Sequence, residues 1–133
     1  MALCVLAGCA RSGPEVVPVA GKITYAGGPW PRGGFIFFTT DEPAAGMPIR
    51  PAWATFDTDG QFQATSFSPG DGLVPGRYKV YIEAWEKAPE MGAKSLPRSL
   101  VPKKYPSAKT SDLEIDVAPG QGKITVAWDV PKP

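Results

Sequence analysis

The feature that most constrains this chain is a series of short runs in which apolar and polar residues alternate. Such an alternation places one face of a β-strand in a core and the other face in solvent. The chain has 15 glycines and 16 prolines in 133 residues, without a collagen-like period, and they separate the runs at short intervals. The pattern predicts an all-β protein whose length suits one domain.

Seven runs fit this description, and the fifth is the clearest because Tyr78, Val80 and Ile82 share one face. The second run is apolar on both faces, so we expect both of its faces to be covered. Seven short strands at this spacing predict a single seven-stranded antiparallel β-sandwich, transthyretin-like or Ig-like. The expected strands are 17–25, 34–40, 52–56, 61–67, 77–85, 112–118 and 123–130.

Two connections carry recognisable turn chemistry. Asp57-Thr-Asp-Gly60 predicts a hairpin between the third and fourth strands, because glycine supplies the positive φ of the turn. A calcium site is the alternative, but calcium takes six to eight oxygens and the following strand does not supply them. Pro75-Gly76 before Tyr78 predicts a turn followed by a tyrosine corner, in which the Tyr78 hydroxyl bonds to backbone.

The segment 86–110 forms a long loop between the fifth and sixth strands, and it contains four prolines. The residues near 90–100 also allow a short helix. The length exceeds what adjacent strands need, yet the segment is rich in apolar residues for a flexible linker. We expect Leu100, Val101 and Tyr105 to anchor it against the sandwich, where it covers an edge strand or a face that holds Tyr81 and Trp85.

The motifs resemble those of a known family. Val19-Ala-Gly-Lys-Ile-Thr-Tyr25, Gly27-Gly-Pro29 and Gly34-Phe-Ile-Phe-Phe38 resemble the opening of carboxypeptidase regulatory-like, or transthyretin-like, domains. Asp57-Thr-Asp-Gly-Gln-Phe62 and Leu73-Val-Pro-Gly-Arg-Tyr-Lys-Val80 resemble the motifs that follow in that family. Val101-Pro-Lys-Lys-Tyr105 and Thr110-Ser-Asp-Leu113 also resemble segments of short bacterial lipoproteins that carry this domain, and the resemblance as a whole covers roughly Val17 to Val130. It implies a prealbumin-like sandwich, usually non-enzymatic, and transfers no catalytic residue.

The N-terminal residues Leu6-Ala-Gly-Cys9 resemble a bacterial lipobox. An apolar run precedes small residues at a cleavage point, and the Cys9 thiol is the acceptor for diacylglycerol. We therefore expect a signal segment at 1–9, a tether at 10–15 and the β-sandwich domain at 16–133. The run is short and no basic residue precedes it, which suits a leader with a longer upstream part. The alternative is a chance match in an ordinary apolar N-terminus.

This interpretation determines the expected location. A mature lipoprotein carries two or three acyl chains, palmitate among them, and these hold it stably at a membrane. Ala10 is not the aspartate that usually favours retention in the inner membrane, so we expect the outer membrane or the cell surface. Cys4 would be removed with the leader, so the folded domain would have no disulfide and no zinc thiolate.

Composition disfavours several functions. The formal net charge of +1 argues against a nucleic-acid partner held through phosphates. The chain has no histidine, no visible metal triad and no glycine-rich phosphate loop after a strand. We therefore predict no enzyme and no cofactor, although a catalytic carboxylate pair stays open at the level of sequence.

Two groups of residues are candidates for binding. Tyr81, Trp85, Trp30 and Trp53 could stack on sugar rings, because aromatic side chains present broad apolar faces; packing within the sheet or beneath the loop is the alternative. The second group could meet anionic lipid headgroups or an anionic wall polymer, or simply form a solvated loop. It comprises Lys103, Lys104, Tyr105 and Lys109.

These observations predict a lipid-anchored extracytoplasmic β-sandwich that acts as a non-catalytic interaction or structural module of the cell envelope. Its partners would be the membrane, through the anchor, and an envelope protein or polysaccharide. A carbohydrate-binding module that uses exposed aromatic side chains is the alternative.

Overall fold

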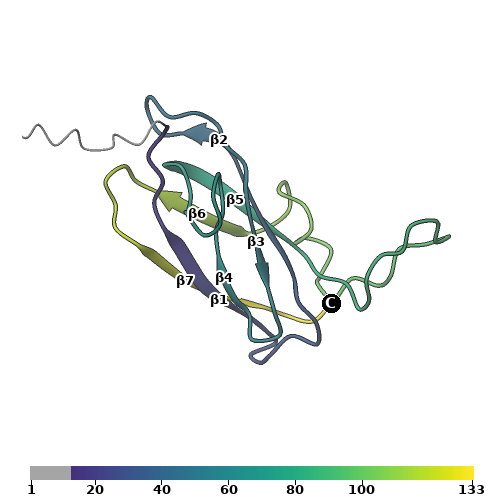
Figure 1. Ribbon diagram of the computed structural model, residues 1–133. Helices are drawn as coiled ribbons and strands as arrows, with labels where there is room; N and C mark the ends of the chain where they lie inside the picture. Colours follow the sequence, from purple (N-terminus) through teal and green to yellow (C-terminus); the bar gives the residue numbers. More distant parts are fainter. Residues whose placement is uncertain (1–12) are drawn as a thin grey trace, which may run out of the picture.

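The computed structural model describes residues 13–133, which form an all-β structure without a helix (Figure 1). Each predicted run contains a strand, although the fourth ends at Gln63 rather than at Phe67. The prediction of a short helix near 90–100 is wrong, because that region contains only turns and irregular backbone. The strands are β1 (Val19–Tyr25), β2 (Gly34–Pro43), β3 (Ala52–Phe56), β4 (Gln61–Gln63), β5 (Gly76–Glu83), β6 (Leu113–Val117) and β7 (Ile124–Val130).

The strands form two sheets with a common core, an arrangement that is sandwich-like (Figure 1). One sheet has the order β4-β1-β7 and the other β3-β2-β5-β6. The prediction of an entirely antiparallel sandwich is wrong, because β1 and β7 are parallel, from Val19 opposite Ile124 to Tyr25 opposite Val130. The Gly120 amide of the turn before β7 donates to the Glu15 carboxylate, 2.7 Å away, just before β1. Both strands therefore leave the same end of the molecule and run in the same direction.

The turn between β3 and β4 forms as predicted, but the hairpin does not. The Gly60 amide donates to the Asp57 carbonyl at 2.9 Å, with Gly60 at φ +75°. A Cβ on Gly60 would lie 1.8 Å from the Ile23 carbonyl oxygen, so the turn also needs glycine for this close approach. It carries the chain from one sheet to the other, because β3 pairs with β2 and β4 pairs with β1.

The prediction of a tyrosine corner is confirmed. Tyr78 is fully buried, and its hydroxyl donates to the Val74 carbonyl at 2.6 Å. Burial raises the pKa of Tyr78 to about 12, because the phenolate would lose its hydration. Val80 and Ile82 lie on the same buried face, as the alternation predicted.

The prediction that both faces of β2 are covered is wrong. Ile36 and Phe38 are buried, whereas Phe37 is half-buried and Phe35 is 47% exposed. Two sheets make two layers, so each sheet has one inner face and one outer face. In residues 13–133 no third layer covers the outer face of β2.

The long segment between β5 and β6 divides into two halves. In the second half, the Leu100 amide donates to the Ala84 carbonyl at 2.8 Å and the Ile82 amide donates to the Tyr105 carbonyl at 2.9 Å. Val101 and Tyr105 are buried and Leu100 is half-buried, so the predicted docking is confirmed. Because β6 pairs with β5 only as far as Val80, this half occupies the rest of that edge.

The first half, 86–97, projects from the body of the molecule, at the right of Figure 1. Met91 and Leu96 are exposed on it. The segment therefore covers an edge of the sheet, and it leaves uncovered the face that holds Tyr81.

Candidate functional site

Four aromatic side chains lie together on the outer face of the four-stranded sheet. Register places Phe37 of β2 between Trp53 of β3 and Tyr81 of β5. The ring centroids of Phe37 and Tyr81 are 5.0 Å apart, and those of Phe35 and Phe37 are 6.1 Å apart, both stacked. We call this surface, formed by Phe35, Phe37, Trp53 and Tyr81, the aromatic face.

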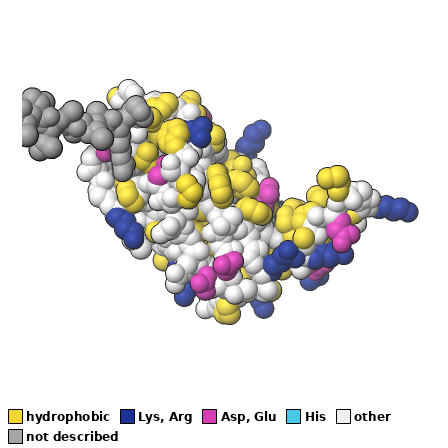
Figure 2. Space-filling model, viewed as in Figure 1, with side chains coloured by type: hydrophobic (Ala, Val, Ile, Leu, Met, Phe, Trp, Pro, Cys, Tyr) yellow, Lys and Arg dark blue, Asp and Glu magenta, His cyan; other side chains and the backbone are white. Residues whose placement is uncertain are grey.

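The strand alternation that builds the core also produces the aromatic face. In β3 the small residues Ala52 and Ala54 point inward, and Trp53 between them points outward and is 49% exposed. Figure 2 shows hydrophobic side chains on the body of the molecule and again on the projecting loop. A cluster of exposed aromatic side chains is uncommon on a soluble surface and typical of an interaction site.

Charge on the rest of this outer face is largely paired between strands. Lys79 pairs with Glu114, and Arg77 contacts Asp116 at 2.9 Å and Glu42 at 3.9 Å. The hydrogen bond from Arg77 to Asp116 raises the pKa of the guanidinium, with the charges of nearby carboxylates adding to it. The aromatic face is thus bordered by pairs of opposite charge rather than by a patch of one sign.

A cavity of about 430 Å³ adjoins the aromatic face at the end of the sheet where the long loop begins. Phe35 belongs to both, and Trp85 and Pro89 contribute further apolar walls. Its charged lining residues include both signs: Arg32, Lys87, Asp57 and Glu83. We call it the end pocket; its volume is within the range of small-ligand sites.

The predicted aromatic candidates separate in the structure. Tyr81 and Trp53 lie on the aromatic face, and half-buried Trp85 lines the end pocket. Trp30 belongs instead to the core: it is 2% exposed, and its Nε1 donates to the Ile23 carbonyl at 2.9 Å. Its ring stacks on Tyr25 with centroids 4.7 Å apart, so it cannot contribute to an exposed platform.

The predicted basic group is also divided. Tyr105 is a core residue, and Lys104 lies over its ring at 5.0 Å while contacting Asp112 at 2.9 Å. The hydrogen bond to Asp112 raises the pKa of Lys104. Lys103 is exposed, and Lys109 lines a different small cavity with Lys79. These residues do not form one basic patch.

Sequence reasoning missed Phe35 and Phe37 as site residues. The signal was present, because a two-sheet sandwich has only one buried face per strand, and β2 carries aromatic residues on both. A strand with aromatic residues on both faces therefore indicates a surface for a partner as well as a core.

Other predicted residues take no part in this surface. Cys9 lies outside the described residues, as do positions 10–12 of the predicted tether. The Asp59 carboxylate accepts a hydrogen bond from the Gln61 amide at 3.1 Å, which is a turn interaction. Within residues 13–133 no group of three or more potential ligands is arranged to hold a metal ion, and no helix has the length and apolarity to cross a membrane.

Comparison with known proteins adds no family to this description. The chain matches no protein-family model, no curated protein and no solved structure. The functional argument therefore depends on the surface itself.

Proposed function

We propose that this protein is a lipid-anchored, extracytoplasmic β-sandwich that acts as a non-catalytic interaction module of the cell envelope. The observation that carries the proposal is the uncovered aromatic face beside the end pocket. Such a surface suits binding, because it presents apolar area and aromatic rings that a partner can cover.

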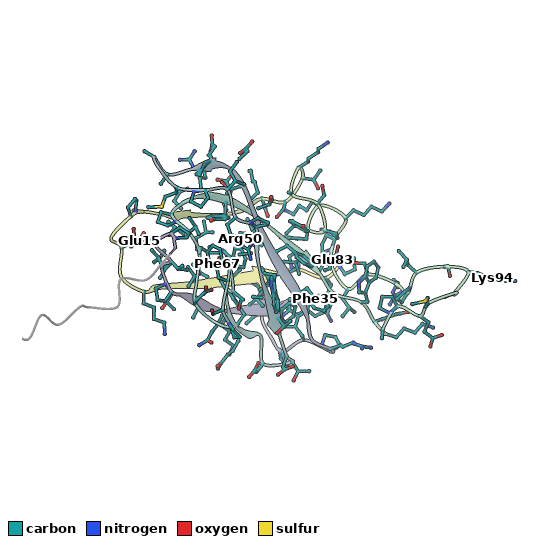
Figure 3. The ribbon with its side chains drawn as sticks, turned by 45° about the horizontal axis from the view of Figure 1, so that its top comes forward. Glu15, Phe35, Arg50, Phe67, Glu83 and Lys94 are labelled. Atoms are coloured by element: carbon teal, nitrogen blue, oxygen red, sulfur yellow. The ribbon has the colours of Figure 1, made fainter. Side chains whose placement is uncertain are left out.

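The lengthwise arrangement of the molecule determines what an N-terminal anchor would hold away from a membrane. Glu15 lies at one end, and Lys94 lies on the projecting loop at the other end (Figure 3). Phe35 and Glu83, which line the end pocket, lie toward the loop end (Figure 3). A chain fixed to a membrane through its N-terminus would therefore present the pocket and the loop away from the bilayer.

We further propose that the domain is transthyretin-like. The order of the strand and turn motifs supports this assignment, as does the tyrosine corner at Tyr78. The parallel pairing of β1 with β7 distinguishes this sandwich from an entirely antiparallel one.

The anchor is tested by replacing Cys9 with serine in cells that express the native upstream sequence. We expect wild type to incorporate labelled palmitate and to sediment with membranes, and Cys9→Ser to lose the label and be found in the soluble fraction. Cys4→Ser is the matched control, because that residue would be removed with the leader, and it should behave as wild type. Equal membrane retention of Cys9→Ser would overturn the lipoprotein proposal.

A carbohydrate-binding module is the second candidate, and the aromatic face is the observation that favours it. Flat aromatic rings stack on the apolar faces of sugar rings, and here Phe37, Trp53 and Tyr81 stand side by side. Purified protein should bind isolated envelopes through this face, so Phe37→Ala should reduce binding. Periodate treatment of the envelopes would abolish binding to a polysaccharide, whereas protease treatment would abolish binding to an envelope protein.

A further inference from the structure

A second cavity, of about 590 Å³, lies at the corner where β3 meets β4. It is lined mainly by polar side chains, with Trp53 as its exposed aromatic wall. The polar lining includes Thr55, Gln61, Gln63, Thr65 and Lys123. We call this cavity the corner groove.

The corner groove exists because β3 and β4 belong to different sheets and still touch at one point. Trp53 and Thr65 exchange two backbone hydrogen bonds, of 3.1 and 2.9 Å. This bridge brings the outward side chains of β3 next to the outward side chains Gln61 and Gln63 of β4. The outer face of one sheet thereby meets the outer face of the other sheet at this corner.

The groove and the end pocket adjoin at Thr55, and we call the two cavities together the track. Thr55 lines both cavities, and Phe35 lies directly opposite Thr55 in the register of β2 and β3. Trp53 stands two residues before Thr55 on the same face of β3. A ligand that follows β3 would meet Trp53 and then Thr55, with Phe35 beside Thr55 on the neighbouring strand.

The chemistry of the track is that of a surface for sugars. Trp53 and Phe35 are about half exposed, at 49% and 47%, and can stack on ring faces. Thr55, Gln61 and Gln63 are exposed and line the groove, and the hydrogen bond from Gln61 to Asp59 uses the Gln61 backbone amide rather than its side chain. Amide and hydroxyl groups both donate and accept hydrogen bonds, as the hydroxyl groups of a sugar require.

The charges along the track favour a neutral ligand. The basic residues are Arg32 and Lys87 in the end pocket and Lys123 in the groove. Asp57 and Glu83 oppose them in the end pocket. With both signs present, the track offers little net attraction to a polyanion, and an apolar partner would leave the groove's polar groups without hydrogen bonds.

We propose that the track binds an extended, neutral polysaccharide, with sugar rings stacked on Trp53 and Phe35 and hydroxyl groups bonded to Thr55, Gln61 and Gln63. This proposal rests on the carbohydrate-binding candidate above. It adds the polar groove as half of the site, and it defines the ligand as uncharged and long enough to span two cavities.

Affinity electrophoresis of the full-length lipidated protein in detergent tests the proposal. Native gels would contain dextran, galactomannan, laminarin or hydroxyethyl cellulose as neutral polymers, and alginate as a polyanion. We expect at least one neutral polymer to retard the protein and alginate not to do so. Trp53→Ala should weaken retardation about tenfold, and Gln63→Ala by a smaller factor.

Phe67→Ala is the matched control. Phe67 has the same 47% exposure as Phe35 but lines neither the groove nor the end pocket, and Arg50 lies 4.5 Å from the centre of its ring (Figure 3). The Phe67→Ala variant should be retarded as strongly as wild type. Gln63→Ala should melt as wild type does, because Gln63 is exposed, whereas Trp53→Ala should lose some stability because Trp53 is half buried; circular dichroism beside the gels confirms that both variants are folded at the temperature of the assay.

Several results would overturn the proposal: no retardation by any neutral polymer, retardation by alginate alone, or an equal loss with Phe67→Ala. Sedimentation of wild type as a dimer that Trp53→Ala dissociates would identify the surface as a contact between two copies. None of these results affects the palmitate and fractionation test of Cys9, so the envelope module would stand without the sugar site.

Discussion

The two faces of β2 carry the same kind of side chain in opposite environments. Phe38 is 1% exposed in the core, whereas its neighbour Phe37 lies on the aromatic face. Residue type is therefore a poor guide to burial in this strand, and the number of layers decides it. The comparison suggests that the inner face of the sheet maintains the fold and the outer face is available for binding.

The largest expected effect is that of a charge on the inner face. Val80→Asp should unfold the protein, because Val80 is fully buried and an unpaired carboxylate there would cost more than a net stability of about 5–15 kcal/mol. Lys79→Ala, one residue away on the outer face, should change the unfolding free energy by less than about 1 kcal/mol. Urea unfolding followed by tryptophan fluorescence measures both; equal midpoints would show that the two faces do not differ.

The second expected effect compares the two phenylalanines directly. Phe38→Ala should cost about 3–5 kcal/mol through lost burial and a cavity. Phe37→Ala should cost about 1 kcal/mol, chiefly through its stacking on Tyr81. Differential scanning calorimetry would resolve the pair, and a larger loss for Phe37→Ala would contradict the assignment of the faces.

A smaller effect concerns the hydroxyl on the inner face. Tyr78→Phe should cost about 1–2 kcal/mol, because the Val74 carbonyl would lose its buried donor. Wild-type stability should also depend on pH. The pKa of folded Tyr78, about 12, exceeds the value of about 10 in the unfolded chain, so the contribution of Tyr78 to stability is constant below pH 10 and falls between pH 10 and 12.

The control for this pH dependence is the same variant. The free energy of unfolding of Tyr78→Phe should fall less steeply than that of wild type between pH 10 and 12. Identical slopes would mean that Tyr78 is ionised to the same extent in both states.

The last prediction compares the two halves of the long segment by their rates of proteolysis rather than by overall stability. Trypsin should cut rapidly at Lys87 or Lys94 on the projecting half and slowly at Lys103 or Lys104 beside buried Tyr105. Tyr105→Ala should accelerate cleavage at the second pair by loosening the docked half. Mass spectrometry of the fragments measures the order, and early cleavage at Lys103 in wild type would contradict docking.

Much of the local structure was predictable. Alternation located all seven strands and the buried face of β5, and turn chemistry predicted the turn at Gly60 and the corner at Tyr78. The apolar residues Val101 and Tyr105 correctly predicted docking of the long segment. Each of these features depends on residues a few positions apart in the sequence, so the local residue types are enough to predict it.

The candidate site was only partly predictable. Tyr81 and Trp53 were recognised as aromatic candidates, but Trp30 was assigned with them although it is packed on Tyr25 in the core. Trp30 follows a turn rather than lying in an alternating strand, so no pattern indicated its direction. Phe35 was expected to be covered because its run is apolar on both faces, although a two-sheet sandwich buries only one face of each strand.

By itself, the sequence determined where the strands lie, which face of β5 is buried and where the chain turns. Only the tertiary structure decided that β7 lies parallel to β1, that β3 and β4 separate into different sheets, and that Trp53 borders both the aromatic face and the corner groove. The physical reason is that alternation specifies a face but neither a neighbour nor a direction. Strand partners far apart in the chain are selected by the packing of the whole core, and the binding surface is formed where those partners meet.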